Sequence, residues 1–144
     1  MIRDLFFLVL ILASACVHPR SGEPVALFRA GDSGYACFRI PAIVKTERGT
    51  ILAFAEARRK GCSDTGDIDL VLRRSGDGGK SWGPLQVIWD SGDDASGNPA
   101  PVVDRETGAV WLLSTWNLGT DHESQIIDRT SRDTSQLVGD PGRS

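Results

Sequence analysis

The chain has 144 residues, of which 40% are hydrophobic and 24% charged, and these proportions are ordinary for a soluble globular protein. Its 16 basic and 19 acidic residues give a net charge of -3, with no basic patch and no block of like charge. We therefore expect no nucleic-acid partner. His18 and His122 stand far apart, and no cysteine or histidine pair has metal-ligand spacing, so we expect no metal site and no cofactor.

The first residues differ from the rest of the chain. An apolar run over 5–12 is followed by small residues and then by Cys16. The run is shorter than the roughly 20 apolar residues that cross a bilayer. It predicts an exported protein with a signal peptide over 1–16 and a short linker over 17–24. Small residues before a cysteine are also typical of bacterial lipoproteins. The protein is therefore expected in the periplasm, at the cell surface with a lipid anchor at Cys16, or secreted.

From Val25 onward the apolar pattern is that of β-strands. Residues 67–73 alternate polar and apolar side chains, which indicates a strand with one buried face. Glycine and aspartate cluster between the apolar runs, at the spacing of antiparallel sheets, and no segment shows a helical period. The sequence predicts an all-β domain over 25–134 and a disordered or aberrant tail over 135–144. The strands are expected at 39–44, 50–56, 67–73, 84–89, 101–103 and 110–114.

The sharpest local motif is S-G-D-G-G-K-S-W over 75–82, which has the form S-x-D-x-G-x-x-W through Ser75, Asp77, Gly79 and Trp82. In a hairpin turn, the serine and aspartate can bond loop amides, glycine can take positive φ, and tryptophan can cover the hairpin base. The motif resembles the Asp-box, the repeated turn of sialidase-type β-propellers. In that family the box is a folding element that lies away from the active site.

A second motif, Phe38-Arg39-Ile40-Pro41, resembles the F/Y-R-I-P sequence near the start of sialidase domains. Followed by an Asp-box, with a strand hairpin between them, it is more specific than either motif alone. The resemblance implies that Arg39 is the first of three arginines that bind the carboxylate of sialic acid. A guanidinium suits this role because it stays charged and can donate two parallel hydrogen bonds.

Three further segments extend the resemblance. Residues 53–58 resemble the second strand of the first blade, which implies that Glu56 and Arg58 lie at the pocket rim on one face; an exposed ion pair is the alternative. Residues 61–67 resemble the mobile loop that carries the general acid/base, here Asp64, with Asp67 as the rival candidate. An acid there needs a raised pKa, which burial under bound sugar would supply. Asn98 would bind the N-acetyl group or a hydroxyl of the sugar, or be an ordinary turn residue.

Over about 24–134 the chain is thus identified as a member of the bacterial exo-α-sialidase family. This implies the first blade and part of the second of a six-bladed β-propeller. It also implies retaining hydrolysis of terminal α-linked sialic acid on glycoproteins and glycolipids, with a tyrosine nucleophile. That nucleophile, its glutamate and the other two arginines belong to later blades, and Tyr35 is no candidate by position.

Several alternatives stay open at this stage. A non-catalytic sialic acid-binding propeller and a functionless remnant compete with the enzyme, and a trans-sialidase competes with a hydrolase. Cys37 and Cys62 either pair, as two thiols of an exported protein can, or remain separate. Because part of a propeller exposes strand edges and an apolar face, we expect the chain by itself to be unstable or to aggregate, without sialidase activity.

Overall fold

The structure, a computed structural model, describes residues 24–131 and the backbone of residues 136–142. The predicted signal peptide, nearly all of the predicted linker and Cys16 lie outside the described residues. Among the helices of the described part, none has the length and apolar character needed to cross a membrane.

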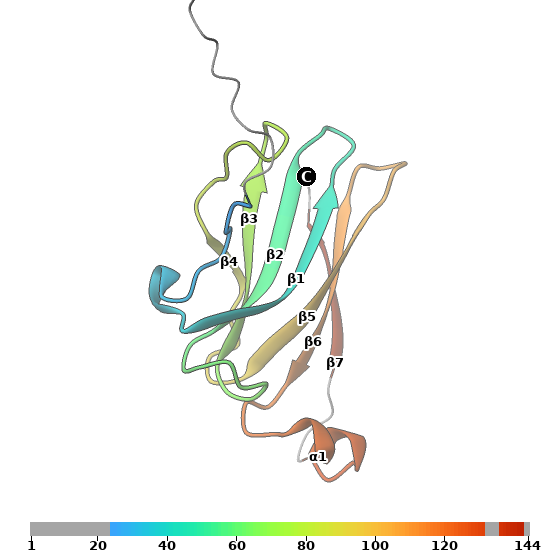
Figure 1. The fold of residues 1–144 in the computed structure, drawn as a ribbon. Helices are drawn as coiled ribbons and strands as arrows, with labels where there is room; N and C mark the ends of the chain where they lie inside the picture. The colour runs from blue at the N-terminus through green and yellow to red at the C-terminus, as the bar shows by residue number, and fades with distance from the viewer. Residues whose placement is uncertain (1–23, 132–135, 143–144) are drawn as a thin grey trace, which may run out of the picture.

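The first group of strands is an antiparallel meander (Figure 1). Strands β2 and β3 are paired along their whole length, whereas β4 is short and pairs only with residues 70–72 in the middle of β3. All four strands overlap segments predicted from the sequence. The group consists of β1 (Cys37–Lys45), β2 (Ile51–Arg58), β3 (Ile68–Ser75) and β4 (Gln86–Trp89).

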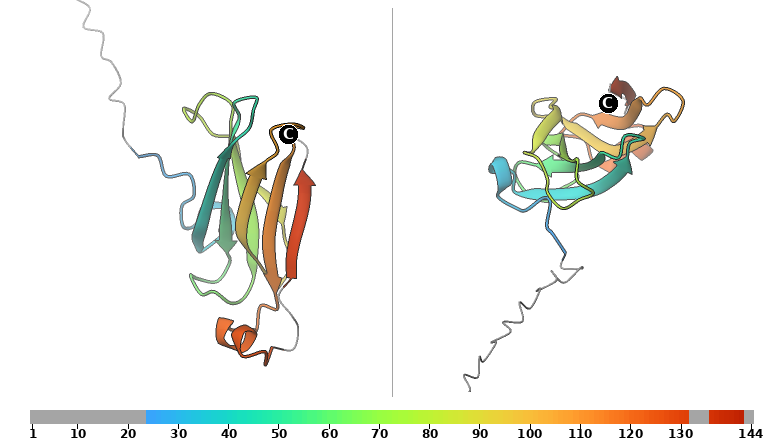
Figure 2. Two further views of the ribbon diagram at one scale, coloured as in Figure 1. Left: turned by 90° about the vertical axis from the view of Figure 1, so that its right-hand side faces the viewer. Right: turned by 90° about the horizontal axis from the view of Figure 1, so that it is seen from above.

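A second antiparallel group lies beside the first, as Figure 2 shows, and consists of β5 (Ala95–Val103), β6 (Val110–Asn117) and β7 (Gln136–Gly142). The two groups join where β3 and β5 run parallel, with Ile68 opposite Ala95. The all-β prediction is confirmed. Strand β5 begins well before the predicted residue 101. Gly97, Asn98 and Pro99 have the composition of a turn, which is why the prediction began later, yet they are part of the strand.

The core lies on both faces of β2, because successive side chains of a strand point to opposite faces. On one face, Phe54 packs with Leu52 and Leu72 and with Val110 of the second group. On the other face, the small side chains of Ala55 and Ala57 leave room for the ring of Tyr35, which is almost fully buried. Burying a side chain such as Phe54 contributes about 1.5–3 kcal/mol. These contacts fix β2, and β2 in turn carries Glu56 and Arg58.

Two short helical segments and one strand were not predicted. The helix α1 (Glu123–Ile127) and the 3-10 turn η1 (Asp32–Gly34) are too short for a helical period to show in the sequence. The prediction of a disordered tail over 135–144 is wrong for 136–142, which form β7 along the edge of β6. Strand pairing uses backbone groups, so a segment poor in apolar residues can still extend a sheet.

The turn over 75–82 has the hydrogen bonds expected from its sequence. Ser75 Oγ donates to Asp77 Oδ1 and accepts from the amide of Gly79, both at 2.8 Å. Asp77 Oδ1 also accepts from the amide of Ser81 at 2.9 Å, and Trp82 Nε1 donates to the Gly79 carbonyl at 3.2 Å. The bonds from Ser81 and Ser75 hold the pKa of Asp77 well below its usual range.

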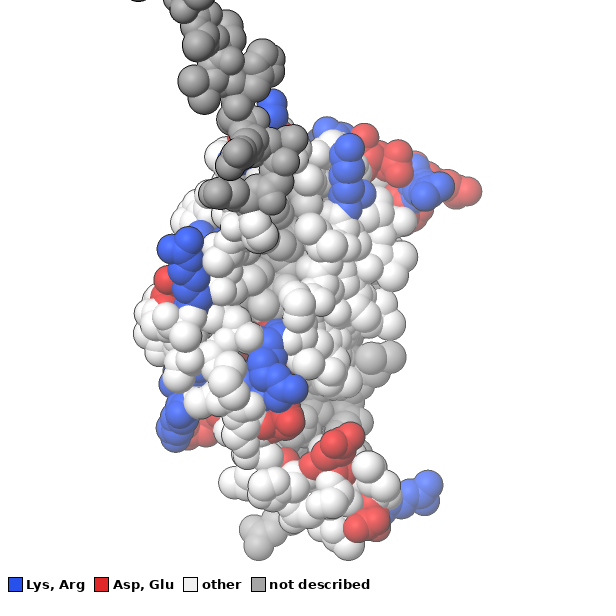
Figure 3. Space-filling view, in the orientation of Figure 1, with Lys and Arg blue, Asp and Glu red and all other residues white. Residues whose placement is uncertain are grey.

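Charged side chains of both signs are mixed over the face drawn in Figure 3, and no broad area of that face carries a single sign. The surface there offers no field that would favour one sign of partner.

Candidate active site

The two strands that border the site, β1 and β5, share an irregularity. Each has a shift of register, between Arg39 and Ala42 in β1 and between Gly97 and Ala100 in β5. Within each shift a non-glycine residue has a positive φ, 50° at Ile40 and 52° at Asn98, and the next residue is proline. Such bulges bend a strand and redirect its side chains, and strained residues of this kind persist only where their surroundings hold them. For β1, the proline at 41 inside the predicted strand 39–44 was the available sequence signal.

A cavity of about 310 Å³ lies beside these bulges. Its size is at the lower end of the range for small-ligand sites. Both strand groups contribute to its lining, and the segment around α1 adds two acidic residues that sequence reasoning missed. The lining includes the predicted residues Glu56, Arg58, Asp64 and Asn98, and the unpredicted Thr115, Asn117, Asp121 and Glu123.

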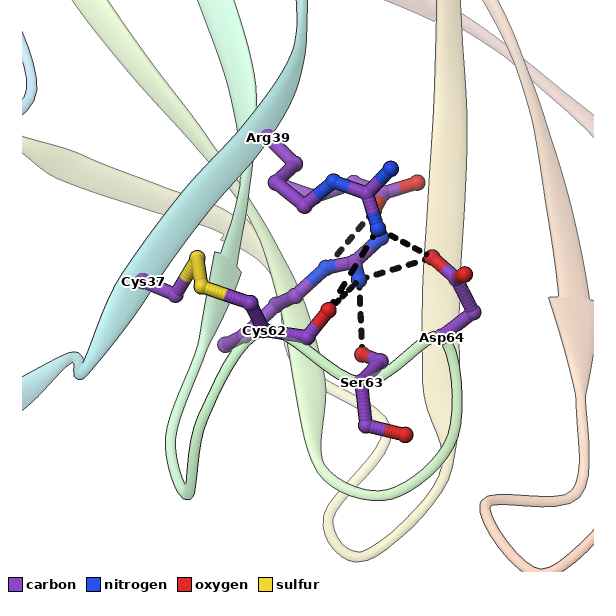
Figure 4. Close-up of a disulfide and its surroundings, with 7 residues drawn as sticks. Cys37, Arg39, Cys62, Ser63 and Asp64 are labelled. Atoms are coloured by element: carbon purple, nitrogen blue, oxygen red, sulfur yellow. Dashed lines mark hydrogen bonds and ion pairs between the residues drawn. A yellow bond between two sulfur atoms is a disulfide. The ribbon is translucent and has the colours of Figure 1, made fainter.

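Asp64 is the meeting point of the charged side chains. Its Oδ1 lies 2.8 Å from Nη1 of Arg39 and 2.7 Å from Nη1 of Arg58 (Figure 4). The Asp64 side chain is 70% exposed and that of Arg39 42%, whereas Arg58 is only 4% exposed. The hydrogen bond from Arg58, helped by the charges of Arg58 and Arg39, lowers the pKa of Asp64. The raised pKa expected of an acid is therefore not found in the chain without bound sugar.

Arg58 is fixed from several sides. Its Nη2 lies 2.5 Å from Glu56 Oε2, and its Nη1 donates to the carbonyls of Cys62 at 2.8 Å and Ser63 at 2.6 Å. Glu56 and Arg58 are on one face of β2 and both line the cavity. Both are buried, so they lie in the wall of the cavity and not at an exposed rim, and the alternative of an exposed ion pair is wrong. Strand β5 covers them, and a Cβ on Gly97 would come within 2.7 Å of Glu56 Oε1.

Asn98 is held in place by two of these neighbours. Its backbone amide donates to Glu56 Oε1 and its side-chain Nδ2 donates to Thr115 Oγ1, both at 2.9 Å. Asn98 therefore lines the cavity on a strand bulge rather than in an ordinary turn.

Asp67, the rival candidate for the acid, belongs to a different cluster. Its Oδ2 lies 3.4 Å from Nε of Arg59, and Nη2 of Arg59 lies 2.9 Å from Oδ2 of the buried Asp69. Tyr35 donates its hydroxyl proton to Asp69 at 2.5 Å, and the Arg59 guanidinium lies 4.6 Å from the centre of the Tyr35 ring. Burial and the bond to Asp69 raise the pKa of Tyr35. This tyrosine, the only one in the sequence, is unsuited to be a nucleophile.

The alternative left open for the cysteines is decided by the structure. A disulfide joins Cys37, the first residue of β1, to Cys62 in the loop that carries Asp64, with 5.3 Å between the two Cα atoms. Across the described residues no group of three or more histidine, cysteine, aspartate or glutamate side chains could hold a metal ion.

Known proteins similar to this chain are sialidases. The chain is 44% identical over 93 residues to an exo-alpha-sialidase of Aspergillus fumigatus, which covers 60% of this chain and 23% of that protein. It is 36% identical over 114 residues to a sialidase of Micromonospora viridifaciens, which covers 74% of this chain and 18% of that protein. It is 35% identical over 124 residues to human sialidase-4, which covers 83% of this chain and 25% of that protein. No family model matches the chain.

Solved structures with a similar fold include a sialidase and a trans-sialidase. The Hadza microbial sialidase Hz136 superposes with a TM-score of 0.66 and 28% identity, covering 80% of this chain and 26% of that protein. The intramolecular trans-sialidase from Ruminococcus gnavus superposes with a TM-score of 0.55 over 67% of this chain and 25% of that protein. At 24% identity, that second match supports the fold alone.

The chain spans only part of the curated relatives it matches, from 18% of the length of the Micromonospora viridifaciens protein to 33% of a sialidase of Paraclostridium sordellii. Within that part, the sequence matches, the all-β fold and the polar cavity agree. The chain belongs to the sialidase family.

Proposed function

We propose that the whole protein is an exo-α-sialidase, which hydrolyses terminal α-linked sialic acid from glycoproteins and glycolipids. The observation that carries the proposal is that two guanidinium groups, of Arg39 and Arg58, meet one carboxylate at the edge of a polar cavity. Sialic acid is itself a carboxylate, and a site that recognises it needs at least one fixed guanidinium.

Arg39 is the proposed ligand of the substrate carboxylate. Its side chain is partly exposed and its ion-pair partner is Asp64, so a substrate carboxylate of the same chemistry can compete for it. Arg58 is less available, because Glu56 and the two loop carbonyls already occupy its donors. In this account Arg58 holds Glu56 and the loop in place, and Asn98 contributes a polar side chain to the sugar pocket.

Asp64 is the proposed general acid/base. Sialic acid binding would act on its pKa in two ways that have the same sign. A substrate carboxylate on Arg39 removes one of the charges that lower the pKa of Asp64, and the sugar shields the carboxyl from water, which disfavours its charged form. Both changes raise the pKa and make the protonated acid available for the departing glycosidic oxygen.

A second candidate function is sialic acid binding without catalysis. It is favoured by the lowered pKa of Asp64, which suits a permanent anion. A binding protein needs Arg39 but has no use for a proton on Asp64, so the two functions differ in what Asp64 does.

The discriminating experiment is the substitution Asp64→Asn in the whole protein, with turnover of a fluorogenic sialoside and affinity for free sialic acid both measured. For an enzyme we expect turnover to fall about 10²–10⁴-fold while affinity changes little. Arg105→Ala, which removes an exposed ion pair with Glu47, is the matched control and should leave both unchanged. Equal turnover in Asp64→Asn and the parent protein would rule out the acid/base role.

We also propose that the protein is exported, either secreted, periplasmic or anchored through a lipid on Cys16. The disulfide supports export, because such bonds persist in oxidising compartments and are rare in the cytosol. Mass spectrometry of the amino-terminal peptide from the producing cell tests this. Cleavage before Cys16 with an added lipid mass would support the anchor, cleavage without it would support release, and an intact amino terminus in the cytosol would contradict export.

A further inference from the structure

We propose that the Cys37–Cys62 disulfide is a positioning element of the candidate active site, which holds Asp64 against Arg39 and Arg58, so that reducing the bond releases Asp64. The consequence of this positioning for catalysis rests on the proposed function.

The two cysteines stand next to the charged residues in the sequence. Cys37 precedes Arg39 by two positions and lies opposite Arg58 in the pairing of β1 with β2. Cys62 precedes Asp64 by two positions. The bond therefore joins the strand that carries one cation to the loop that carries the anion, as Figure 4 shows.

The loop has few other means of staying in place. Residues 59–66 have the sequence R-K-G-C-S-D-T-G, which contains no large apolar side chain. Cys62, Ser63 and Asp64 are all exposed. Its ends are fixed by backbone bonds, from Arg59 to Asp67 at 3.2 Å and from Gly66 to Gly119 at 2.7 Å. Between these ends, packing contributes little, and only the disulfide and polar contacts hold the chain.

The polar contacts depend on where the disulfide puts the loop. Arg58 donates to the carbonyls of Cys62 and Ser63, and Arg39 donates to that of Cys62 at 3.3 Å. The pair of Arg39 with Asp64 is largely exposed, and exposed ion pairs alone order a loop weakly. A covalent link two residues away restricts the positions open to Asp64, so these contacts form at a smaller entropic cost.

The bond is also placed for reduction. Cys37 is buried, but Cys62 is an exposed residue, so the loop side of the bond lies at the surface, from which a thiol reagent would approach. Reduction would transfer two electrons from the reagent to the disulfide, leaving two protein thiols and an oxidised reagent.

The first test compares the whole oxidised protein with the same protein reduced by excess dithiothreitol, under conditions where mass spectrometry shows that Cys37 and Cys62 are both free thiols. The pKa of the Asp64 carboxyl and the hydrogen exchange of residues 59–67 are followed by NMR. We expect reduction to shift the pKa of Asp64 upward toward that of an ordinary aspartate and to speed exchange in the loop. The pKa of Asp77, in the distant turn, is the internal control and should stay low. An unchanged Asp64 pKa after complete reduction would overturn the proposal.

A second variant covers the case in which reduction unfolds the chain, which a rise in the pKa of Asp77 would reveal. Inserting two glycines between Cys62 and Ser63 keeps the disulfide but lengthens its reach to Asp64. We expect this variant to stay folded and to raise the pKa of Asp64, whereas an unaltered pKa would contradict the proposal. Two glycines inserted after Arg48, in the turn between β1 and β2, form the matched control. None of these readouts uses a sialoside, so a failure of the proposed function would show separately, as absent turnover in the oxidised protein.

Discussion

Arg39 and Arg58 share a carboxylate partner but differ in how far the protein covers them. Arg58 is almost fully buried beside the buried Glu56, whereas Arg39 reaches Asp64 from a half-exposed position. A buried charge whose partner is removed remains without compensation, and an exposed one is hydrated. The same residue type therefore has a structural role at one position and an available binding group at the other.

This difference predicts unequal effects on stability. Arg58→Ala should lower the free energy of unfolding by about 3–5 kcal/mol, because it leaves Glu56 charged and buried. Arg39→Ala should lower it by about 1 kcal/mol or less. Urea denaturation followed by tryptophan fluorescence measures both, with Arg105→Ala as the exposed control. Similar losses for Arg58→Ala and Arg39→Ala would contradict the distinction.

For single residues, the sequence predicted which side chains belong to the site but not how deeply they are buried. It pointed to Arg39, Glu56, Arg58, Asp64 and Asn98, and the structure brings all of them to one cavity or its edge. The burial of Glu56 and Arg58 was not predictable, because strand β5 covers them through Gly97. Asn98 of the same strand, which bonds Glu56, is 42 positions away from it in the sequence. The lowered pKa of Asp64 depends on contacts with Arg58 and Arg39 that form only when the loop folds back against β1 and β2.

Among the elements, the turn over 75–82 depends most directly on its own sequence. Ser75 is buried and both donates to Asp77 and accepts from the Gly79 amide. Ser75→Ala removes both bonds and leaves the amide without its acceptor, so we expect a loss of about 1–3 kcal/mol in the free energy of unfolding. Arg48→Ala, an exposed side chain in the turn between β1 and β2, should change it by less than about 0.5 kcal/mol. A loss no larger in Ser75→Ala than in Arg48→Ala would show that these bonds do not stabilise the fold.

The same turn predicts how stability depends on pH. Asp77 has a pKa below its ordinary 3.8 in the folded chain, so the unfolded state binds a proton more readily. The contribution of Asp77 to the free energy of unfolding is therefore present above its ordinary pKa and is lost as the pH falls through its pKa in the folded chain. Stability should decline between about pH 5 and about pH 2, and the decline should be shallower in Asp77→Asn. Urea midpoints across this range measure it, and identical slopes in the two proteins would contradict the assignment.

Elements were predictable where local patterns decide them. The cores of β1 to β4 and the turns between them follow from apolar runs and glycine-rich breaks. Strand β5 was shortened in the prediction because Gly97, Asn98 and Pro99 are unfavourable in regular strands, and only the surrounding sheet keeps them there. Strand β7 forms along β6 through backbone pairing, which leaves little trace in side-chain composition.

The whole molecule presents apolar side chains on strands of both groups. Ile43 of β1 is 63% exposed, Val102 of β5 54%, and Trp111 of β6 44%. Such side chains on neighbouring strands favour association with other apolar surfaces.

We therefore predict that the 144-residue chain produced by itself associates in solution and turns over no sialoside, since its only tyrosine is buried against Asp69. Light scattering after size exclusion, together with release of a fluorogenic aglycone, provides the test. A monomer with a cooperative thermal transition and measurable turnover would contradict this prediction.

The claim that Arg39 binds the carboxylate of sialic acid is tested most directly by NMR titration with free sialic acid. The whole oxidised protein and its Arg39→Ala variant would be titrated at neutral pH, with the signals of Arg39, Asp64 and Asn98 followed. We expect saturable shifts at these residues in the parent protein, no saturable shifts in Arg39→Ala, and no response to the methyl ester of sialic acid, which lacks the charge. Equal responses of the parent protein to the acid and its ester, or of the parent and Arg39→Ala to the acid, would contradict the claim.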